Sequence, residues 1–513
     1  MTDRKNTGYN LPGKAESYWL ATTPDSNYPV LPGDVRVDVA IIGGGIVGIT
    51  SAFLLKQAGV SVTLIEADRI IKGVTGYTTA KITSQHDLIY NRLISELGRD
   101  QAKQYADSNQ AAIEKIEYIV RSWDISCDFA HKPAYVYAGS EDSAQNILDE
   151  VRAARSLGLP ASFEESVPLP IETYGSVRFN HQAQFHPRKY LCALATEIEG
   201  NGCYIFEKTW ALGIEGGEPV VLKTDRGTVI ADDVIQATHF PIVDNPGGLS
   251  NRLSQSMSYA LGVRIEETFP DGMFINAEEP GRSLRSQPAE GGELVLVVGD
   301  GHPTGSGNPT HEHYRHLEDW ARSIYSVRSI DYHWLTEDVM PDDGVPLIGR
   351  LTPDSGHSYL ATGFRKWGMT TGTAAAMILT DMILGRDSPW TEVYDPSRSK
   401  QGSQLIVQKD ISRVEPNQGV LVEKGKDKVA VYRDPQGVFY TLNPACRHMG
   451  CSVSWNDADK TWDCHCHGSR YNARGEVILS PAVYGLLEKK VMEQKNTYSE
   501  AADMARQEQG ENE

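Results

Sequence analysis

Short apolar runs and longer periodic stretches divide the chain into predicted elements. Residues 37–42 (VDVAII) form an apolar run that is followed at once by GGGIVG at 43–48 and by a helical pattern that ends at Gly59. A second apolar run, 60–65, comes next. A strand, a glycine turn, a helix and a second strand in this order are typical of a βαβ unit with a parallel sheet.

Further along the chain the pattern of apolar positions changes twice. Residues 98–123 carry apolar side chains at helical spacing, which predicts one long amphipathic helix. Residues 256–301 consist of short alternating runs that are split by Gly, Pro and Asp, which predicts an antiparallel sheet.

The glycine turn carries the first candidate chemistry. Gly43 permits the tight turn, Gly45 lets a pyrophosphate approach the backbone, and Gly48 lets the helix pack on the strand. Glu66 follows the second strand, where an acid accepts hydrogen bonds from ribose hydroxyls. A purely structural turn is the alternative, but the register of strand, helix and acid favours a dinucleotide site.

Length and charge narrow the class of protein. The 513 residues are enough for about three domain-sized units. The net charge of -19 repels phosphate backbones, so nucleic acid is not an expected partner. The first 24 residues show neither an apolar signal core nor a twin arginine, and the apolar stretch 39–55 is explained as strand, turn and helix. We therefore expect a cytoplasmic protein without a membrane span.

Cysteine and histidine recur at fixed spacing near the C-terminus. Cys446-x-His448 and Cys464-x-x-His467 each place one thiolate and one imidazole on a tight loop. In a Rieske 2Fe-2S centre two cysteines hold one iron and two histidines hold the other. A zinc finger instead pairs its cysteines in one knuckle and its histidines on one helix. The arrangement resembles a Rieske site with these four ligands, and a zinc or empty knuckle is the alternative.

The resemblance to Rieske domains extends to neighbouring residues. Cys451 and Cys466 are a spare pair, one in each loop, for which it implies a disulfide that clamps the loops, although cytoplasmic disulfides are rare. Ser469 and Tyr471 match the run that donates hydroxyl hydrogen bonds to the cluster sulfurs in high-potential Rieske proteins. Such donors stabilise the reduced cluster and raise its potential.

Residues 73–90 (GVTGYTTAKITSQHDLIY) resemble the second flavin-contacting loop of the D-amino-acid-oxidase-like flavoenzymes. The resemblance favours FAD over NAD and implies that Thr78, Thr79 and Ala80 contact the cofactor. Lys81 would place an ammonium near the flavin or the substrate, although a solvated or ion-paired lysine is the alternative. The residues through which several relatives anchor FAD covalently are absent, so the FAD is predicted to be non-covalent.

The segment 361–372 (ATGFRKWGMTTG) resembles the final flavin segment of the same family, in which a glycine-rich turn containing Gly363 leads into a helix. The resemblance implies that backbone N–H groups of Trp367, Gly368 and Met369 stabilise negative charge on the reduced flavin.

Two groups of basic side chains allow competing interpretations. Arg282 and Arg285 lie on the predicted sheet, where they could clamp a substrate carboxylate or remain surface arginines. Lys81 and Arg285 are therefore the candidate catalytic residues. The trio His311, His313 and His316 suggests a metal, but apolar residues at helical spacing in the same segment predict an amphipathic helix instead.

These resemblances imply a fold class of α/β and α+β. We expect an N-terminal arm (1–36), an FAD-binding Rossmann-like oxidoreductase domain (37–398) with an antiparallel substrate sheet within about 252–335, an all-β Rieske domain (405–493) and a polar tail (494–513).

The expected function is that of an FAD-dependent dehydrogenase. It would oxidise an amine, amino acid or similar small donor and pass electrons from the flavin through the 2Fe-2S cluster to an unidentified external acceptor. The alternatives are a reductase in which electrons enter through the cluster, and a non-enzymatic redox sensor.

Overall fold

The structure is a computed structural model that describes residues 11–243, 248–304, 310–352, 354–398, 414–424, 427–447, 450–456, 460–464, 469–479, 482 and 484–489. The chain divides into two compact units, Met1–Ser403 and Gln404–Glu513. Every helix within the described ranges is too short or too polar to cross a bilayer.

The first unit contains an eight-stranded sheet in which β7, β2, β1, β10 and β17 are parallel neighbours. The predicted glycine turn follows β1 and leads into a helix, which confirms the βαβ interpretation. The strands are β1 (Val35–Ile42), β2 (Val62–Ile65), β7 (Tyr204–Phe206), β8 (Ala211–Glu215), β9 (Val220–Thr224), β10 (Thr228–Gln236), β16 (Leu347–Arg350) and β17 (Ser358–Thr362).

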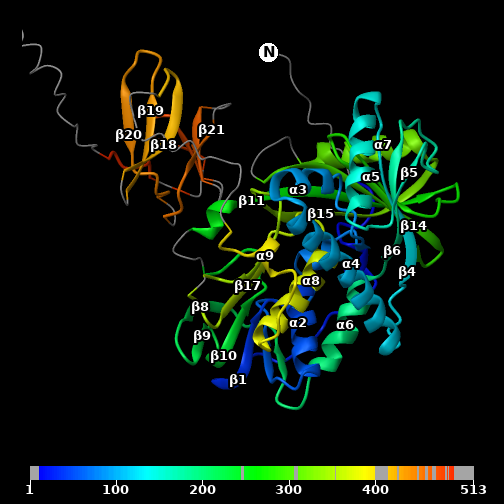
Figure 1. Cartoon of the computed structure of the whole chain (residues 1–513), viewed down its shortest axis with the longest axis horizontal. Helices are drawn as coiled ribbons and strands as arrows, with labels where there is room; N and C mark the ends of the chain where they lie inside the picture. Colours follow the sequence, from blue (N-terminus) through cyan, green and yellow to red (C-terminus); the bar gives the residue numbers. More distant parts are fainter. Residues whose placement is uncertain are drawn as a thin grey trace, which may run out of the picture. The chain divides into compact units, whose positions relative to one another are not determined.

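Four helices pack beside this sheet (Figure 1). α2 (Ile46–Gln57) and α8 (Gly368–Ile383) lie against each other, α6 (Pro187–Ile198) packs on α2, and α4 (Arg99–Ser122) packs on α8. α4 is the long helix that the spacing of apolar residues predicted. The interior between sheet and helices is the main hydrophobic core.

The second sheet has nine strands in the order β15-β11-β14-β13-β12-β4-β6-β3, with β5 beside β6. It contains the predicted antiparallel strands but extends beyond 252–335, because strands from 81–184 pair with it. They are β3 (Lys81–Ile82), β4 (Ala130–Tyr137), β5 (Ala161–Glu164), β6 (Ser176–Gln184), β11 (Leu253–Ile265), β12 (Met273–Asn276), β13 (Arg282–Ala289), β14 (Gly292–Pro303) and β15 (Val327–Pro341).

One face of the second sheet packs into the main core, and α7 (Thr310–Ile324) covers β11 and β14 on the other face. α7 is the amphipathic helix that the apolar spacing of its segment predicted. The remaining helical elements are α1 (Tyr18–Ala21), η1 (Val74–Tyr77), α3 (Tyr90–Leu97), η2 (Glu141–Ser143), α5 (Ala144–Ser156), η3 (Leu249–Arg252), α7 (Thr310–Ile324) and α9 (Thr391–Tyr394).

The second unit consists of two small antiparallel sheets in its described residues, as expected for an all-β domain. A core that includes Val453, Trp462 and Tyr471 lies within it. The strands are β18 (Gln418–Lys424), β19 (Asp427–Arg433), β20 (Phe439–Leu442), β21 (Ser454–Asn456), β22 (Thr461–Asp463), β23 (Arg470–Asn472) and β24 (Val477–Leu479).

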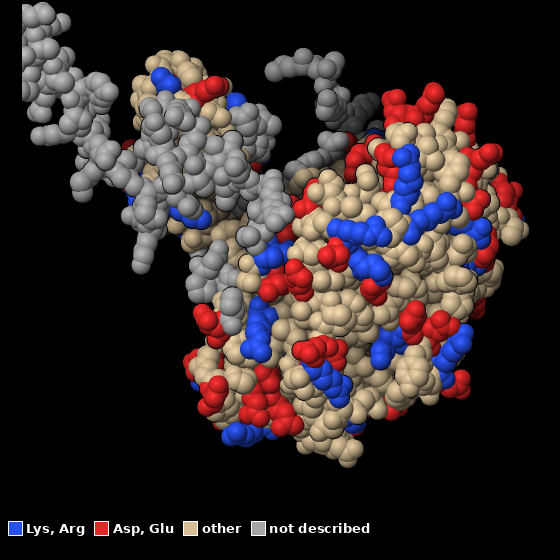
Figure 2. All heavy atoms as spheres, in the orientation of Figure 1, with Lys and Arg blue, Asp and Glu red and all other residues tan. Residues whose placement is uncertain are grey.

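The surface agrees with the acidic composition. On the face drawn in Figure 2, acidic and basic side chains of the first unit are interspersed, and the basic ones form no continuous surface there. This face offers no track for a phosphate backbone.

Candidate functional site

A cavity of about 390 Å³ in the first unit begins at the glycine turn. Gly43 has a φ of +108°, and a Cβ there would lie 2.4 Å from the carbonyl oxygen of Ala237. A Cβ at Gly48 would lie 1.9 Å from the carbonyl oxygen of Gly43. Gly45 lines the cavity directly before the first turn of α2. The turn therefore provides the close backbone approach and the helix N-terminus that a pyrophosphate needs.

Glu66 lines the same cavity at the end of β2. Its Oε2 accepts a hydrogen bond from the Gly44 amide (2.7 Å), and its Oε1 accepts one from the Asp68 amide (3.0 Å). These two donors hold the carboxylate in place, while each oxygen keeps a further lone pair for a ligand hydroxyl. The position suits the ribose contact that the sequence predicts.

The loop before β3 supplies the next part of the wall. Thr78 and Thr79 line the cavity, and the indole N–H of Trp19 donates to the Thr78 carbonyl at 2.7 Å. Ala80 is buried behind them with a φ of +55°, and its carbonyl accepts a hydrogen bond from Arg285 at 3.4 Å. The two threonines thus face the cavity, whereas Ala80 forms the bend that presents them.

Two of the three residues predicted to face the flavin at the start of α8 line the cavity. Gly368 and Met369 line it. The amide of Trp367 instead donates to the Phe364 carbonyl at 2.9 Å, and its ring stacks on His86 at 4.9 Å. This amide is therefore used within the turn and is not available to a flavin. Gly363 has a φ of +79° and packs on Pro341 rather than lining the cavity.

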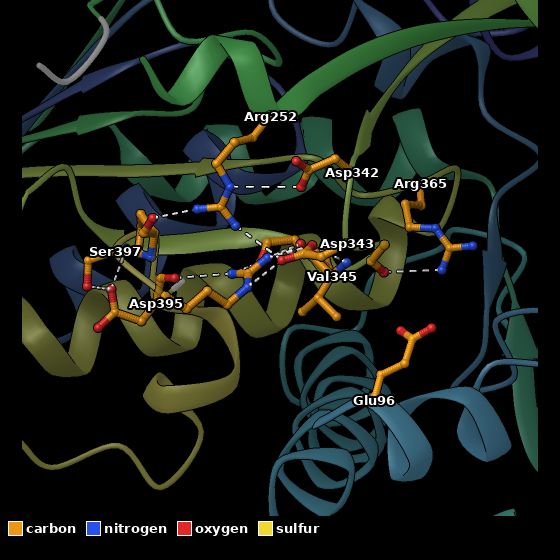
Figure 3. Close-up of polar contacts among 12 residues, drawn as sticks. Glu96, Arg252, Asp342, Asp343, Val345, Arg365, Asp395 and Ser397 are labelled. Atoms are coloured by element: carbon orange, nitrogen blue, oxygen red, sulfur yellow. Dashed lines mark hydrogen bonds and ion pairs between the residues drawn. The ribbon is translucent and has the colours of Figure 1, made fainter. Parts of the chain in front are cut away.

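The loop between β15 and β16 is held by Asp343 (Figure 3). Its carboxylate accepts two hydrogen bonds from Arg398, at 2.9 and 3.0 Å, and one from Arg252 at 3.1 Å. Arg365 lines the cavity and donates to the Gly344 carbonyl of this loop at 3.2 Å. The cavity wall at Arg365 is thereby tied to the end of the first unit at Arg398.

The far end of the cavity holds an acid from the second sheet and a cation from the loop between β17 and α8. Asp338 and Lys366 both line this end, beside Ser258 of β11. Burial raises the pKa of Asp338 to about 6, although Lys366 acts to lower it. A Cβ at Gly301 would lie 3.0 Å from the Lys366 ammonium, so the glycine leaves room for that side chain.

Neither Asp338 nor Lys366 stands out in the sequence. They come from different segments, and only the fold places both at the cavity. Lys366 and its neighbour Arg365 have φ values of +71° and +49°. Left-handed backbone at two consecutive non-glycine residues is rare and concentrates at functional sites, but it has no sequence signature.

Lys81 and Arg285 lie beside the cavity rather than in its lining. The Lys81 ammonium donates to the Ser283 hydroxyl, and Ser283 is paired in the ladder with Val298, a lining residue. Paired residues share a face of the sheet, so Lys81 and Ser283 lie on the cavity side. Burial lowers the pKa of Lys81 to about 7 and that of Arg285 to about 9.

The predicted clamp of Arg282 and Arg285 is wrong. Residues three apart on a strand face opposite sides of the sheet, and Arg282 points toward α7. There its guanidinium pairs with Asp300 at 2.7 Å and lies over the ring of Trp320. Arg285 is fully buried, with its side chain against Trp19 and Gln287, and it does not line the cavity.

The histidine trio is also divided. His311 is exposed, whereas His313 and His316 both turn toward Asp300. The helix that was predicted in place of a metal site is present, but it brings two of the histidines to a carboxylate that the sequence did not indicate.

The described part of the second unit contains two of the four predicted cluster ligands. Cys446 and Cys464 are buried, each 2% exposed. The Tyr471 hydroxyl lies 3.1 Å from the Cys446 sulfur and also accepts a hydrogen bond from the Arg447 amide at 3.1 Å. His448 and His467 lie outside the described residues.

Two further predictions concern the same loops. Ser469 is buried, and its hydroxyl oxygen accepts a hydrogen bond from the Ala482 amide at 2.9 Å, close to the strand that carries Tyr471. Cys451 is disulfide-bonded. Because Cys466 lies outside the described residues, the pairing of Cys451 with Cys466 stays a prediction.

Family models agree with both units. The model of the FAD dependent oxidoreductases (DAO) matches residues 38–382, and the model of the Rieske [2Fe-2S] domain matches residues 404–489. The chain therefore belongs to the FAD dependent oxidoreductase family, and it carries a C-terminal Rieske domain. The glycine turn, Glu66 and the threonine loop fit FAD, and the buried thiols of Cys446 and Cys464 fit an iron–sulfur cluster.

Individual relatives share one or both units. A Rieske 2Fe-2S iron-sulfur protein of Bacillus subtilis, YhfW, is 35% identical over 91% of this chain and 96% of its own length. The gamma-glutamylputrescine oxidoreductase of Escherichia coli is 21% identical over 72% of this chain and 88% of its own length.

Solved structures show the same fold in the first unit. Glycine oxidase from Geobacillus kaustophilus aligns with a TM-score of 0.62 at 18% identity, and the alignment covers 71% of this chain and 99% of that one. L-Proline dehydrogenase from P. horikoshii aligns with a TM-score of 0.59 at 21% identity over 72% of this chain and 98% of that one.

Proposed function

We propose that this oxidoreductase is a dehydrogenase for an amine, amino acid or similar small donor. In this proposal FAD is held non-covalently, and electrons leave through the Rieske cluster to an external acceptor. The observation that carries the donor class is the pair Asp338 and Lys366 at the sheet end of the cavity. Relatives named for glycine, L-proline and gamma-glutamylputrescine support the same class.

The charges of this pair complement an amino acid. A carboxylate at Asp338 attracts a donor ammonium, and the Lys366 ammonium attracts a donor carboxylate. Asp338 is buried and Lys366 is exposed, and both line the cavity. Charge-assisted hydrogen bonds to such groups are about twice as strong as neutral ones. A donor held between them would have its reactive C–H bond fixed in one orientation.

When bound, FAD supplies acceptance of a hydride from the donor C–H bond, and the cluster supplies single-electron transfer to an acceptor. The amine loses a proton as its imine forms, and we assign its acceptance to the Asp338 carboxylate, which lines the cavity at the proposed donor position. Arg285 holds the bend of the flavin loop through the Ala80 carbonyl, so we assign it a positioning role. Lys81 adds positive charge on the cavity side of the sheet.

Outward electron flow is supported by Tyr471. A hydroxyl that donates to the Cys446 sulfur stabilises the reduced cluster and raises its potential. The change Tyr471→Phe should lower the cluster midpoint potential by about 60 mV, which is a tenfold change for a one-electron couple. Iron content should be unchanged. Tyr432→Phe is the matched control, because the Tyr432 hydroxyl donates to the Asn417 side chain at 3.2 Å and not to a cysteine.

An anaerobic screen tests the donor class. The purified holoprotein is mixed with amines and amino acids, and loss of flavin absorbance is followed. We expect bleaching by at least one compound that carries an amine next to a C–H bond, and slower bleaching in Lys366→Met if the donor has a carboxylate. Bleaching only after an external reductase has reduced the cluster would instead support the reductase direction.

A further inference from the structure

A cluster of polar side chains lies on the face of the second sheet away from the cavity, beneath α7. Its centre is Asp300, which has a φ of +54°. The ladder between β11 and β14 shifts register here, since Tyr259 pairs with Gly299 but Met257 pairs with His302. Such a bulge inserts an extra residue and redirects a side chain. The bulge is what turns Asp300 toward α7, although Val298 two residues earlier faces the cavity.

Two histidines of α7 approach the Asp300 carboxylate, each through its Nδ1 atom. The Nδ1 atoms of His313 and His316 lie 2.5 and 3.1 Å from Oδ2 of Asp300. The three atoms all lie within 4.8 Å of one another. His313 and His316 are three residues apart on a helix, so their side chains share one face.

The surroundings hold the three side chains in place. The Arg282 guanidinium donates to the other carboxylate oxygen, Oδ1, at 2.7 Å and leaves Oδ2 to the histidines. The His313 ring is stacked on Tyr259 at 4.7 Å and on His302 at 4.5 Å. Asp300 and His313 are buried, whereas the His316 side chain is 45% exposed. The cluster is thus fixed on one side and open to solvent on the other.

We propose that Asp300, His313 and His316 bind a divalent transition-metal ion of the zinc type. Two imidazole nitrogens and one carboxylate oxygen are a donor set that zinc accepts, with water in the fourth position. Bond lengths of about 2.0–2.1 Å in a tetrahedron place ligand atoms about 3.3 Å apart. The observed 2.5 and 3.1 Å N···O separations need to change by less than about 1 Å, and binding replaces two N–H···O hydrogen bonds, because each ligating Nδ1 must give up its proton.

The Arg282 contact agrees with this assignment. Carboxylates that ligate metals are themselves hydrogen-bonded, and loss of such a partner commonly weakens binding about 10- to 100-fold. The metal would join α7 to β14 next to Gly301, the residue against which Lys366 packs on the cavity side. It would therefore stabilise the bulge that shapes both faces of the sheet.

Zinc binding to the full-length holoprotein tests the proposal. Protein freed of loosely bound metal is titrated with Zn²⁺, and zinc, iron and flavin are measured after removal of excess. We expect about one zinc per chain with iron and flavin unchanged, and at least tenfold weaker binding in Asp300→Asn and His316→Ala. His311→Ala is the matched control, because His311 lies on the same helix but outside the cluster.

Three outcomes of the zinc titration distinguish the proposed site from the alternatives. Zinc retained by His311→Ala but lost by His316→Ala supports the site. Unchanged flavin content in His316→Ala shows that the loss of zinc does not come from misfolding. Equal zinc uptake by the wild type and His316→Ala overturns the proposal and leaves a hydrogen-bonded Asp–His cluster. Zinc uptake that matches iron loss would place the metal at the Rieske ligands and would also overturn it.

Discussion

The two faces of the second sheet differ in whether their cationic side chains form ion pairs with carboxylates. On the α7 face, Arg282 lies 2.7 Å from Asp300 in an ion pair. On the cavity face, the buried Lys81 and Arg285 instead donate to neutral groups of the described residues, the Ser283 hydroxyl and the Gln287 side chain. Burying a cation without a partner is costly, so such groups persist where a ligand supplies the opposite charge. The comparison suggests that bound ligands balance the positive charge on the cavity face, whereas the protein's own side chains balance it on the α7 face.

The pKa values agree with this difference. Burial lowers the pKa of Lys81 to about 7 and raises that of Asp338 to about 6, so both groups change charge close to neutral pH. Groups with such shifted values in a cleft are candidates for function. We expect the cavity face, and not the α7 face, to control flavin chemistry.

The largest expected effect comes from a variant of the glycine turn that cannot bind the flavin. In Gly48→Ala the new Cβ would lie 1.9 Å from the Gly43 carbonyl oxygen, so the turn must shift. We expect flavin content to fall at least tenfold while iron content is kept, because the glycine turn belongs to the first unit. Absorbance and iron analysis measure both. Gly213→Ala, at a site with open space for a Cβ, is the control. Full flavin content in Gly48→Ala would contradict the assignment of the turn.

Removing the positive charge of Lys366 from the cavity should lower the rate of turnover. Lys366→Met should lower kcat/KM about 10- to 100-fold for a donor with a carboxylate, since a hydrogen bond to a charged group is worth about 1.5–3 kcal/mol. Steady-state assays with a donor found in the screen measure this. Lys103→Met, at an exposed lysine of α4, is the control. Unchanged kcat/KM would remove Lys366 from the donor site.

The pH dependence sharpens the role of Asp338. Its pKa of about 6 means that the carboxylate is ionised above pH 6 and protonated below it. Because only the ionised form attracts a donor ammonium, kcat/KM should fall as pH drops through about 6. This limb should be absent from the profile of Asp338→Asn. A limb that persists in the variant belongs to another group.

The smallest expected effect compares the two faces directly. Lys81→Met should lower the flavin midpoint potential by about 30 mV, equivalent to about 1.4 kcal/mol for a two-electron couple, because a nearby cation favours the reduced, more negative flavin. With a pKa of about 7, the lysine is mostly charged at pH 6 and mostly neutral at pH 8, so the shift should be larger at pH 6. Arg282→Met, on the α7 face, should leave the potential unchanged. Equal shifts in both variants would break the comparison.

Local sequence patterns predicted the parts of the fold that depend on neighbouring residues. The turn at Gly43 to Gly48, α4 and the antiparallel sheet follow from short-range periodicity and from the backbone freedom of glycine. Glu66 was found because its distance from the turn is fixed by one helix and one strand. The four predicted Rieske ligands stand out in the sequence because their spacing lies within two short loops.

The missed residues depend on contacts between distant segments. Trp210 lines the cavity because β7 ends beside β2, which no local pattern reveals. Asp300 reaches α7 only because a bulge interrupts the alternation of its strand. The clamp of Arg282 and Arg285 failed for the simpler reason that a spacing of three on a strand separates side chains.

One redox titration of the holoprotein tests the central claim most directly. Flavin absorbance and the paramagnetic signal of the reduced cluster are recorded in the same sample as the potential is lowered. If electrons leave the flavin through the cluster, the cluster midpoint potential should be more positive than the two-electron potential of the flavin. A cluster that is reduced only at potentials well below the flavin would contradict outward flow and would favour a reductase.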